Sequence, residues 1–153
     1  MAKLSKLNTE GEVDKKPKKN LRLKKSTVDR VVKELVDRAK VINADKSLCC
    51  WVTKLALFGS CVKGKERPGD IDIAYQLANK KVSDAKLRAC HKRARPPYIG
   101  GIMSIYWPHI EVIYKLKNRS KSISLHDIDE LNRLDDPTHT VIYDFVPPKS
   151  KTK

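Results

Sequence analysis

The chain has 153 residues, with 33 lysines and arginines against 18 aspartates and glutamates and a formal net charge of +15. This length suits one compact domain, and a hydrophobic content of 40% argues against wholesale disorder. No apolar run approaches the roughly 20 residues that cross a bilayer, and the lysine-rich N-terminus lacks the apolar stretch of a secretory signal. We therefore expect a basic cytoplasmic domain with no membrane segment.

The positive charge is unevenly distributed along the chain. Residues 1–25 carry nine basic residues against three acidic ones, residues 147–153 add three lysines, and residues 80–95 hold seven basic residues against one acidic residue. We expect a flexible basic arm over 1–25, a folded domain over 26–146 and a basic tail over 147–153. Such charge attracts polyphosphates and nucleic acids, although a solubilising role explains the tails equally well.

Hydrophobic spacing predicts the elements of the first half of the chain. An apolar stripe with helical period predicts a helix over 26–43. The run Leu-Ala-Leu-Phe over 55–58 predicts a buried strand that ends in a turn at Gly59 and Ser60. A second strand is expected over 70–77.

The second half is predicted to continue the alternation of helices and strands. We expect a helix over 81–95 that is stopped by two prolines, a strand over 109–116, a helix over 124–134 and a strand over 140–146, with no assignment for 98–108. This order predicts the α/β (α+β) class, with a small mixed sheet and helices packed on it.

The four cysteines are Cys49, Cys50, Cys61 and Cys90. Their spacing does not match a zinc site, and nothing in the sequence indicates an oxidising compartment. We therefore expect reduced thiols.

Two aspartates at the start of the second predicted strand are the main candidates for chemistry. Asp70 and Asp72 are two residues apart, so they project from one face of a strand while Ile71 and Ile73 enter the other. Two carboxylates this close repel each other unless cations bind between them. A pair of Mg²⁺ ions suits them, because Mg²⁺ prefers oxygen ligands and keeps sites for substrate phosphates.

The turn before these aspartates supplies candidates for binding phosphate. Gly59 allows the backbone to approach a phosphate closely, and the Ser60 hydroxyl can add a hydrogen bond. Lys63, Lys65 and Arg67 follow in the connecting loop, where they could neutralise a polyphosphate.

Glu111 is the candidate for a third metal ligand. It lies in the apolar run Ile-Glu-Val-Ile over 110–113, and an inward acid in such a run must pair or bind a metal. An outward orientation on the face of His109 is the alternative. With Asp70 and Asp72 already placed, we favour the metal ligand.

The sequence Phe58-Gly59-Ser60, nine residues, then Asp70-Ile71-Asp72 resembles the signature of the DNA polymerase β-type nucleotidyltransferase superfamily. The likeness is greatest to the minimal nucleotidyltransferases, which are stand-alone domains of similar length, and covers about residues 30–116. It implies a polymerase β-like fold, in which Asp70 and Asp72 share two Mg²⁺ or Mn²⁺ ions and Gly59 and Ser60 hold the β- and γ-phosphates of an NTP. Glu111, where the family more often has Asp, would activate an acceptor hydroxyl.

The acceptor is expected to be an RNA end, such as that of a tRNA, which the positive charge favours, or a hydroxyl of a partner protein, which the resemblance implies through the pairing of minimal domains with toxins. A helix over 81–95 would align Lys81, Arg88, Lys92 and Arg95 in one basic stripe, which suits a phosphodiester backbone. A solvated helix face is the alternative for the stripe. For the whole chain, the alternative is a non-catalytic module that binds a partner protein or nucleic acid through its basic face.

Overall fold

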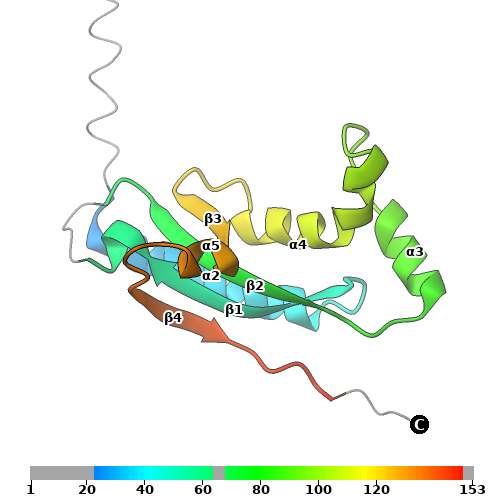
Figure 1. Ribbon diagram of the computed structural model, residues 1–153, viewed down its shortest axis with the longest axis horizontal. Helices are drawn as coiled ribbons and strands as arrows, with labels where there is room; N and C mark the ends of the chain where they lie inside the picture. The colour runs from blue at the N-terminus through cyan, green and yellow to red at the C-terminus, as the bar shows by residue number, and fades with distance from the viewer. Residues whose placement is uncertain (1–22, 64–67, 150–153) are drawn as a thin grey trace, which may run out of the picture.

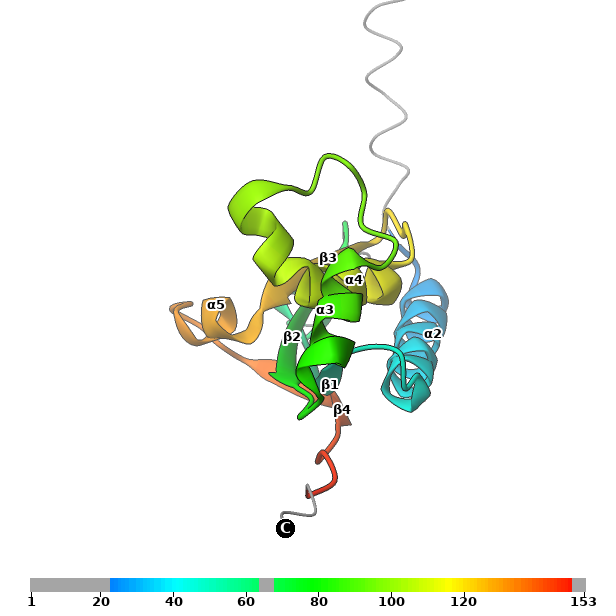
Figure 2. The same ribbon diagram turned by 90° about the vertical axis from the view of Figure 1, so that its right-hand side faces the viewer.

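The computed structural model describes residues 23–63 and 68–149 (Figures 1 and 2). The expected arm over 1–25 and the expected tail over 147–153 lie largely outside these residues. The elements follow in the order α2 (Lys25–Ala44), β1 (Cys50–Phe58), the 3-10 turn η2 (Gly59–Cys61), β2 (Ile71–Asn79), α3 (Asp84–Lys92), the 3-10 segment η3 (Gly101–Tyr106), α4 (Trp107–Lys117), β3 (Ile123–Asp127), α5 (Ile128–Asn132) and β4 (His139–Asp144).

In this part of the chain, four strands form one mixed sheet in the order β3-β2-β1-β4. Strand β1 pairs antiparallel with both β2 and β4, whereas β3 runs parallel to β2. The predicted α/β class with a small mixed sheet is therefore confirmed.

The two faces of the sheet are covered differently. Helices α2 and α4 pack on one face and form the larger core, while the short α5 covers part of the other face (Figures 1 and 2). The predicted apolar stripe of α2 enters the larger core, and Leu35 and Ala39 at its centre are almost fully buried. Strands β1 and β2 alternate between the two cores, as the period of a strand requires.

The predicted strand over 109–116 is wrong, because these residues belong to helix α4. The β-branched residues of this run favour a strand locally. The buried positions of the helix, however, include Trp107, Glu111, Val112 and Leu116, which have helical spacing, and Pro108 stands in the first turn.

The predicted helix over 124–134 is only partly correct. Residues 123–127 form strand β3, whose Ile123 pairs with Ile71 of β2 and is buried in the larger core. The helical part is the five-residue α5, which begins where the side chain of Asp127 accepts a hydrogen bond from the backbone N–H of Asp129.

The predicted helix over 81–95 is shorter in the structure. Helix α3 begins after Ser83, whose Oγ accepts a hydrogen bond from the Lys86 backbone N–H, and it ends at Lys92. Residues 101–106, to which the sequence assigns no element, form the 3-10 segment η3.

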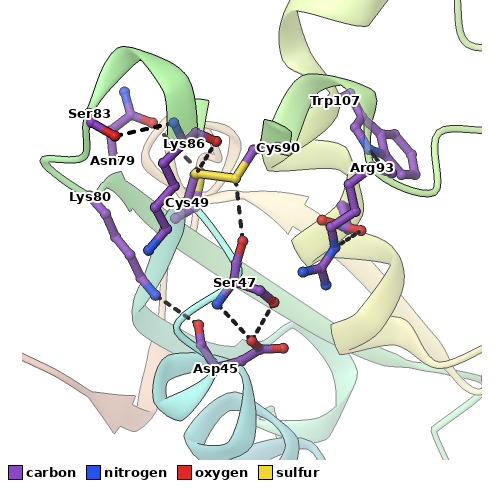
Figure 3. Close-up of a disulfide and its surroundings, with 12 residues drawn as sticks. Asp45, Ser47, Cys49, Asn79, Lys80, Ser83, Lys86, Cys90, Arg93 and Trp107 are labelled. Carbon is purple, nitrogen blue, oxygen red and sulfur yellow. Dashed lines mark hydrogen bonds and ion pairs between the residues drawn. A yellow bond between two sulfur atoms is a disulfide. The ribbon is translucent and has the colours of Figure 1, made fainter. Parts of the chain in front are cut away.

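The cysteines also depart from the prediction, because Cys49, just before β1, forms a disulfide with Cys90 of α3 (Figure 3). Cys50 and Cys61 have free thiols, and burial raises the pKa of the Cys50 thiol to about 11. The sequence could not indicate the pairing, because its two cysteines are 41 residues apart and meet only through the packing of α3. None of the helices in the described ranges is long and apolar enough to cross a membrane.

Candidate functional site

The turn that follows β1 lies against a carboxylate of β2. Gly59 has a φ of +72°, and the backbone N–H groups of Val62 and Lys63 both donate to its carbonyl oxygen at 3.1 Å. A Cβ atom on Gly59 would lie 2.7 Å from Oδ2 of Asp72. This position therefore requires glycine twice, once for its left-handed backbone and once for the close approach of the carboxylate.

Asp72 lies on the α5 side of the sheet. It pairs with Phe58 at the end of β1, while its neighbours Ile71 and Ile73 are fully buried in the core under α2 and α4. This orientation agrees with the predicted alternation. Asp70 comes just before β2 and is exposed, so the two carboxylates stand at the beginning of the strand.

The pKa of Asp72 is raised above its usual range. Partial burial is the larger cause, the negative charge of Asp70 adds to it, and His126 opposes it. The site therefore carries negative charge that its protein surroundings only partly balance, and a bound cation would stabilise it.

The imidazole of His126 in β3 lies beside Asp72, and it is not among the site residues predicted from the sequence. Its Nε2 lies 3.5 Å from Oδ1 of Asp72 and 3.0 Å from Oγ of Ser124, and its Nδ1 lies 3.0 Å from Oε2 of Glu130. The ring also packs edge-on against Phe58, with 5.4 Å between ring centroids. Residues two apart in a strand point to the same face, so a strand prediction would have placed Ser124 and His126 together. The sequence instead predicts a helix over 124–134, in which the two residues do not share a face.

Glu111 is not part of this site. It lies on α4, which covers the opposite face of the sheet, and its Oε2 is 3.5 Å from Nε of Arg93. Its side chain is 7% exposed. An inward acid must pair or bind a metal; here its partner is Arg93, and Glu111 does not join Asp70 and Asp72.

Of the lysines and the arginine predicted to bind phosphate, Lys63 lies within the residues that the structure describes. Lys63 is exposed and forms an ion pair of 3.3 Å with Asp136. Lys65 and Arg67 lie outside the described residues. Ser60 is half-buried in the turn beside Asp72.

The predicted basic stripe does not form on a single helix. Lys81 precedes α3 and Arg95 follows it, so only Arg88 and Lys92 share an exposed face of the helix. The stripe requires a helix that extends to the prolines, whereas α3 ends at Lys92.

The donor set fits a metal that arrives with phosphates better than one held by protein alone. Over residues 23–63 and 68–149, no group of three histidine, cysteine, aspartate or glutamate side chains is placed to hold a metal ion. Asp70 and Asp72 supply two carboxylates, and Mg²⁺ is commonly bound by one or two carboxylates together with substrate phosphates. The pair therefore fits a metal–triphosphate complex but not a complete three-carboxylate site.

Comparison of the chain with family models, with curated proteins and with solved structures finds no match.

Proposed function

We propose that this protein is a metal-dependent nucleotidyltransferase, which moves a nucleoside monophosphate from an NTP to a hydroxyl group. The observation that supports this most directly is the contact between the Gly59 turn and Asp72, where a Cβ would lie 2.7 Å from the carboxylate oxygen. A glycine turn suited to phosphate and a carboxylate suited to a cation thus adjoin each other.

Each residue of the site has a role in this proposal. Asp70 and Asp72 would hold Mg²⁺ or Mn²⁺ together with the triphosphate, and the cation would stabilise the charged form of Asp72, whose pKa is raised by burial and by the charge of Asp70. The Gly59 backbone and the Ser60 hydroxyl contact the β- and γ-phosphates. When bound, the metal neutralises charge that develops on the phosphate oxygens.

The reaction is an in-line displacement at the α-phosphorus. The acceptor oxygen forms a bond to this phosphorus, the bond to the bridging oxygen of the β-phosphate breaks, pyrophosphate leaves and the hydroxyl proton passes to solvent. The chain's contribution is positioning, because alignment of the two reactants lowers the barrier. The acceptor approaches beside Asp72, where Ser124 and His126 are the polar neighbours on β3.

The test is transfer of label from each α-labelled NTP to total RNA or lysate protein, with Mg²⁺ or Mn²⁺. We expect labelling by the wild type, and loss of at least 100-fold in Asp72→Asn and in Asp70→Asn. The matched control is Asp29→Asn, which removes an exposed carboxylate from α2 and should leave labelling unchanged. Persistent labelling in both site variants would refute the assignment.

A non-catalytic nucleotide-binding module is the second candidate, and the position of Glu111 favours it. With Glu111 paired to Arg93 on the other side of the sheet, no third carboxylate reaches Asp70 and Asp72 within the described residues. This module would bind Mg²⁺ and NTP in a way that depends on Asp72 but would transfer no label. Calorimetric titration with a non-hydrolysable NTP analogue, run beside the transfer assay, separates the two candidates.

A further inference from the structure

A second feature of the surface is a pocket of about 650 Å³ at the other end of the β1–β2 hairpin. Trp51 at the start of β1 and Asn79 at the end of β2 line it, and Val82, Pro147 and Pro148 contribute apolar surface. The remaining lining residues are lysines, namely Lys46, Lys80, Lys81, Lys86 and Lys149. We call this the lysine pocket.

The lysines reach the pocket from four separate segments. Lys46 comes from the connection after α2, Lys80 and Lys81 follow β2, Lys86 belongs to α3, and Lys149 belongs to the segment after β4. No carboxylate lines the pocket. In the described ranges, Lys46, Lys86 and Lys149 form no ion pair.

Lys80 is held in place by two contacts. Its Nζ donates to the carbonyl oxygen of Asp45 at 3.1 Å and lies 4.2 Å from the centre of the Trp51 ring (Figure 3 shows the bond to Asp45). Burial lowers the pKa of Lys80, and the positive charge of Lys86 lowers it further. The fold thus gathers like charges that a polyanion would stabilise.

We propose that the lysine pocket binds the phosphodiester backbone of single-stranded nucleic acid. Ammonium groups from four segments match phosphates spaced along a chain better than one isolated phosphate. A flexible strand can follow a concave pocket, whereas a duplex is stiff over about 50 nm. The Trp51 ring already contacts Lys80 and Phe145, so the pocket offers charge rather than a platform for stacking bases.

This pocket is separate from the aspartate site. Asp72 and Asn79 lie seven residues apart on β2, which corresponds to about 23 Å along a strand. Binding of nucleic acid at the lysine pocket therefore requires neither a metal nor a nucleotide at Asp72. The lysine pocket also differs from the basic stripe predicted from the sequence. Of the stripe residues Lys81 lines the pocket, whereas Arg88 and Lys92 do not.

The test uses the full chain and a fluorescein-labelled 12-mer of oligouridine, with binding followed by anisotropy over a range of NaCl concentrations. The variant is Lys46→Glu with Lys86→Glu. Glutamate at position 86 stands three residues after the helix cap Ser83, so it completes a capping box and preserves α3. The matched control is Lys33→Glu with Lys40→Glu, which makes the same charge change on the exposed side of α2.

We expect the pocket variant to weaken binding at least tenfold and to reduce the slope of log K against log [NaCl] by about 1.4, since each phosphate contact in a single strand contributes about 0.7. The α2 control should change affinity less than threefold. Thermal melting checks the fold, and the neutral pair Lys46→Gln with Lys86→Gln should give an intermediate loss.

Several results would overturn the proposal. Equal losses in the pocket variant and the control would show that only net charge matters, and absence of binding by the wild type would remove the site altogether. Competition by poly-glutamate as strong as by unlabelled oligouridine would assign the pocket to acidic protein, and equally tight pocket-dependent binding of a duplex would exclude the single-strand assignment. Asp72→Asn should bind oligouridine normally, so failure of transfer and failure of this pocket are distinguishable.

Discussion

The two ends of the β1–β2 hairpin carry opposite charge and are stabilised by different kinds of contact. At one end, Asp70 and Asp72 adjoin the Gly59 turn, and His126 lies 3.5 Å from Asp72. At the other end lies the lysine pocket, where the Cys49–Cys90 disulfide joins the hairpin to α3. The structure of the acidic end is maintained by the close packing of the Gly59 backbone against Asp72. The structure of the basic end is maintained by the covalent bond between Cys49 and Cys90. Because β1 and β2 connect the two ends rigidly, variants can disturb one end while the other serves as its control.

The largest effect is expected from removal of the disulfide. Cys49→Ala with Cys90→Ala frees a loop with a sequence separation of 41, which predicts a loss of about 3–4 kcal/mol in the free energy of unfolding under oxidising conditions. Urea titration measures this loss, with Cys61→Ala as the control. Hydrogen exchange should show faster opening in α3 than in β2. A loss no larger than that of the Cys61→Ala control would show that the cross-link does not stabilise the fold.

Gly59→Ala tests the acidic end. The left-handed φ costs about 1–2 kcal/mol for an alanine, and the contact of 2.7 Å with Asp72 adds to it, so we expect a loss of about 2 kcal/mol. Gly101→Ala is the matched control, because Gly101 also has a positive φ of +58°, but a Cβ added there would meet no atom within 4 Å. It should cost less in the same urea titration. Equal costs would show that Asp72 does not crowd the turn.

Glu111→Gln tests whether the acid on α4 is structural. The variant removes the charge that pairs with Arg93, and because the arginine is 32% exposed, we expect a loss of about 1–2 kcal/mol. Binding of NTP and any transfer at the aspartates should stay within twofold of wild type. A 100-fold loss of transfer with unchanged stability would instead indicate that Glu111 takes part in the proposed reaction.

The smallest effect concerns the pH dependence of Asp72. Because its pKa is raised in the folded state, its favourable contribution to folding is complete below the unfolded pKa and is lost as the pH rises through the folded pKa. Asp72→Asn should therefore raise Tm at pH 7 by on the order of 1–2 °C without divalent cations, and the difference should vanish below about pH 4. Thermal melts from pH 3 to pH 7 measure it. A lower Tm for Asp72→Asn than for the wild type at pH 7 would contradict the inference that the charge of Asp72 destabilises the fold.

The features that the sequence predicts correctly are encoded in nearby residues. The turn at Gly59, the strand position of Asp72 and the apolar stripe of α2 each follow from a short pattern in one segment. The sequence also indicates the mixed sheet, because helices and strands alternate along the chain.

The features that the sequence does not predict depend on contacts between distant segments. Helix α4 resembles a strand in sequence because its β-branched residues dominate locally, and the partner that explains its buried Glu111 is Arg93, which lies outside that helix. The contact of His126 with Asp72 is not predicted, because the sequence of the strand that carries His126 favours a helix. The disulfide depends on the approach of α3 to β1, which no local pattern indicates.

The position of β4 in the sheet has a consequence for the order in which the chain folds. Strand β1 pairs with β2 early in the chain, but its other partner is β4, and Phe58 pairs there with His139. During synthesis β1 therefore has an open edge until nearly the whole domain has been made. Open edges invite pairing with other chains, and contacts so distant in sequence form slowly. A nascent chain stalled before residue 139 should thus be more prone to aggregation than the finished one.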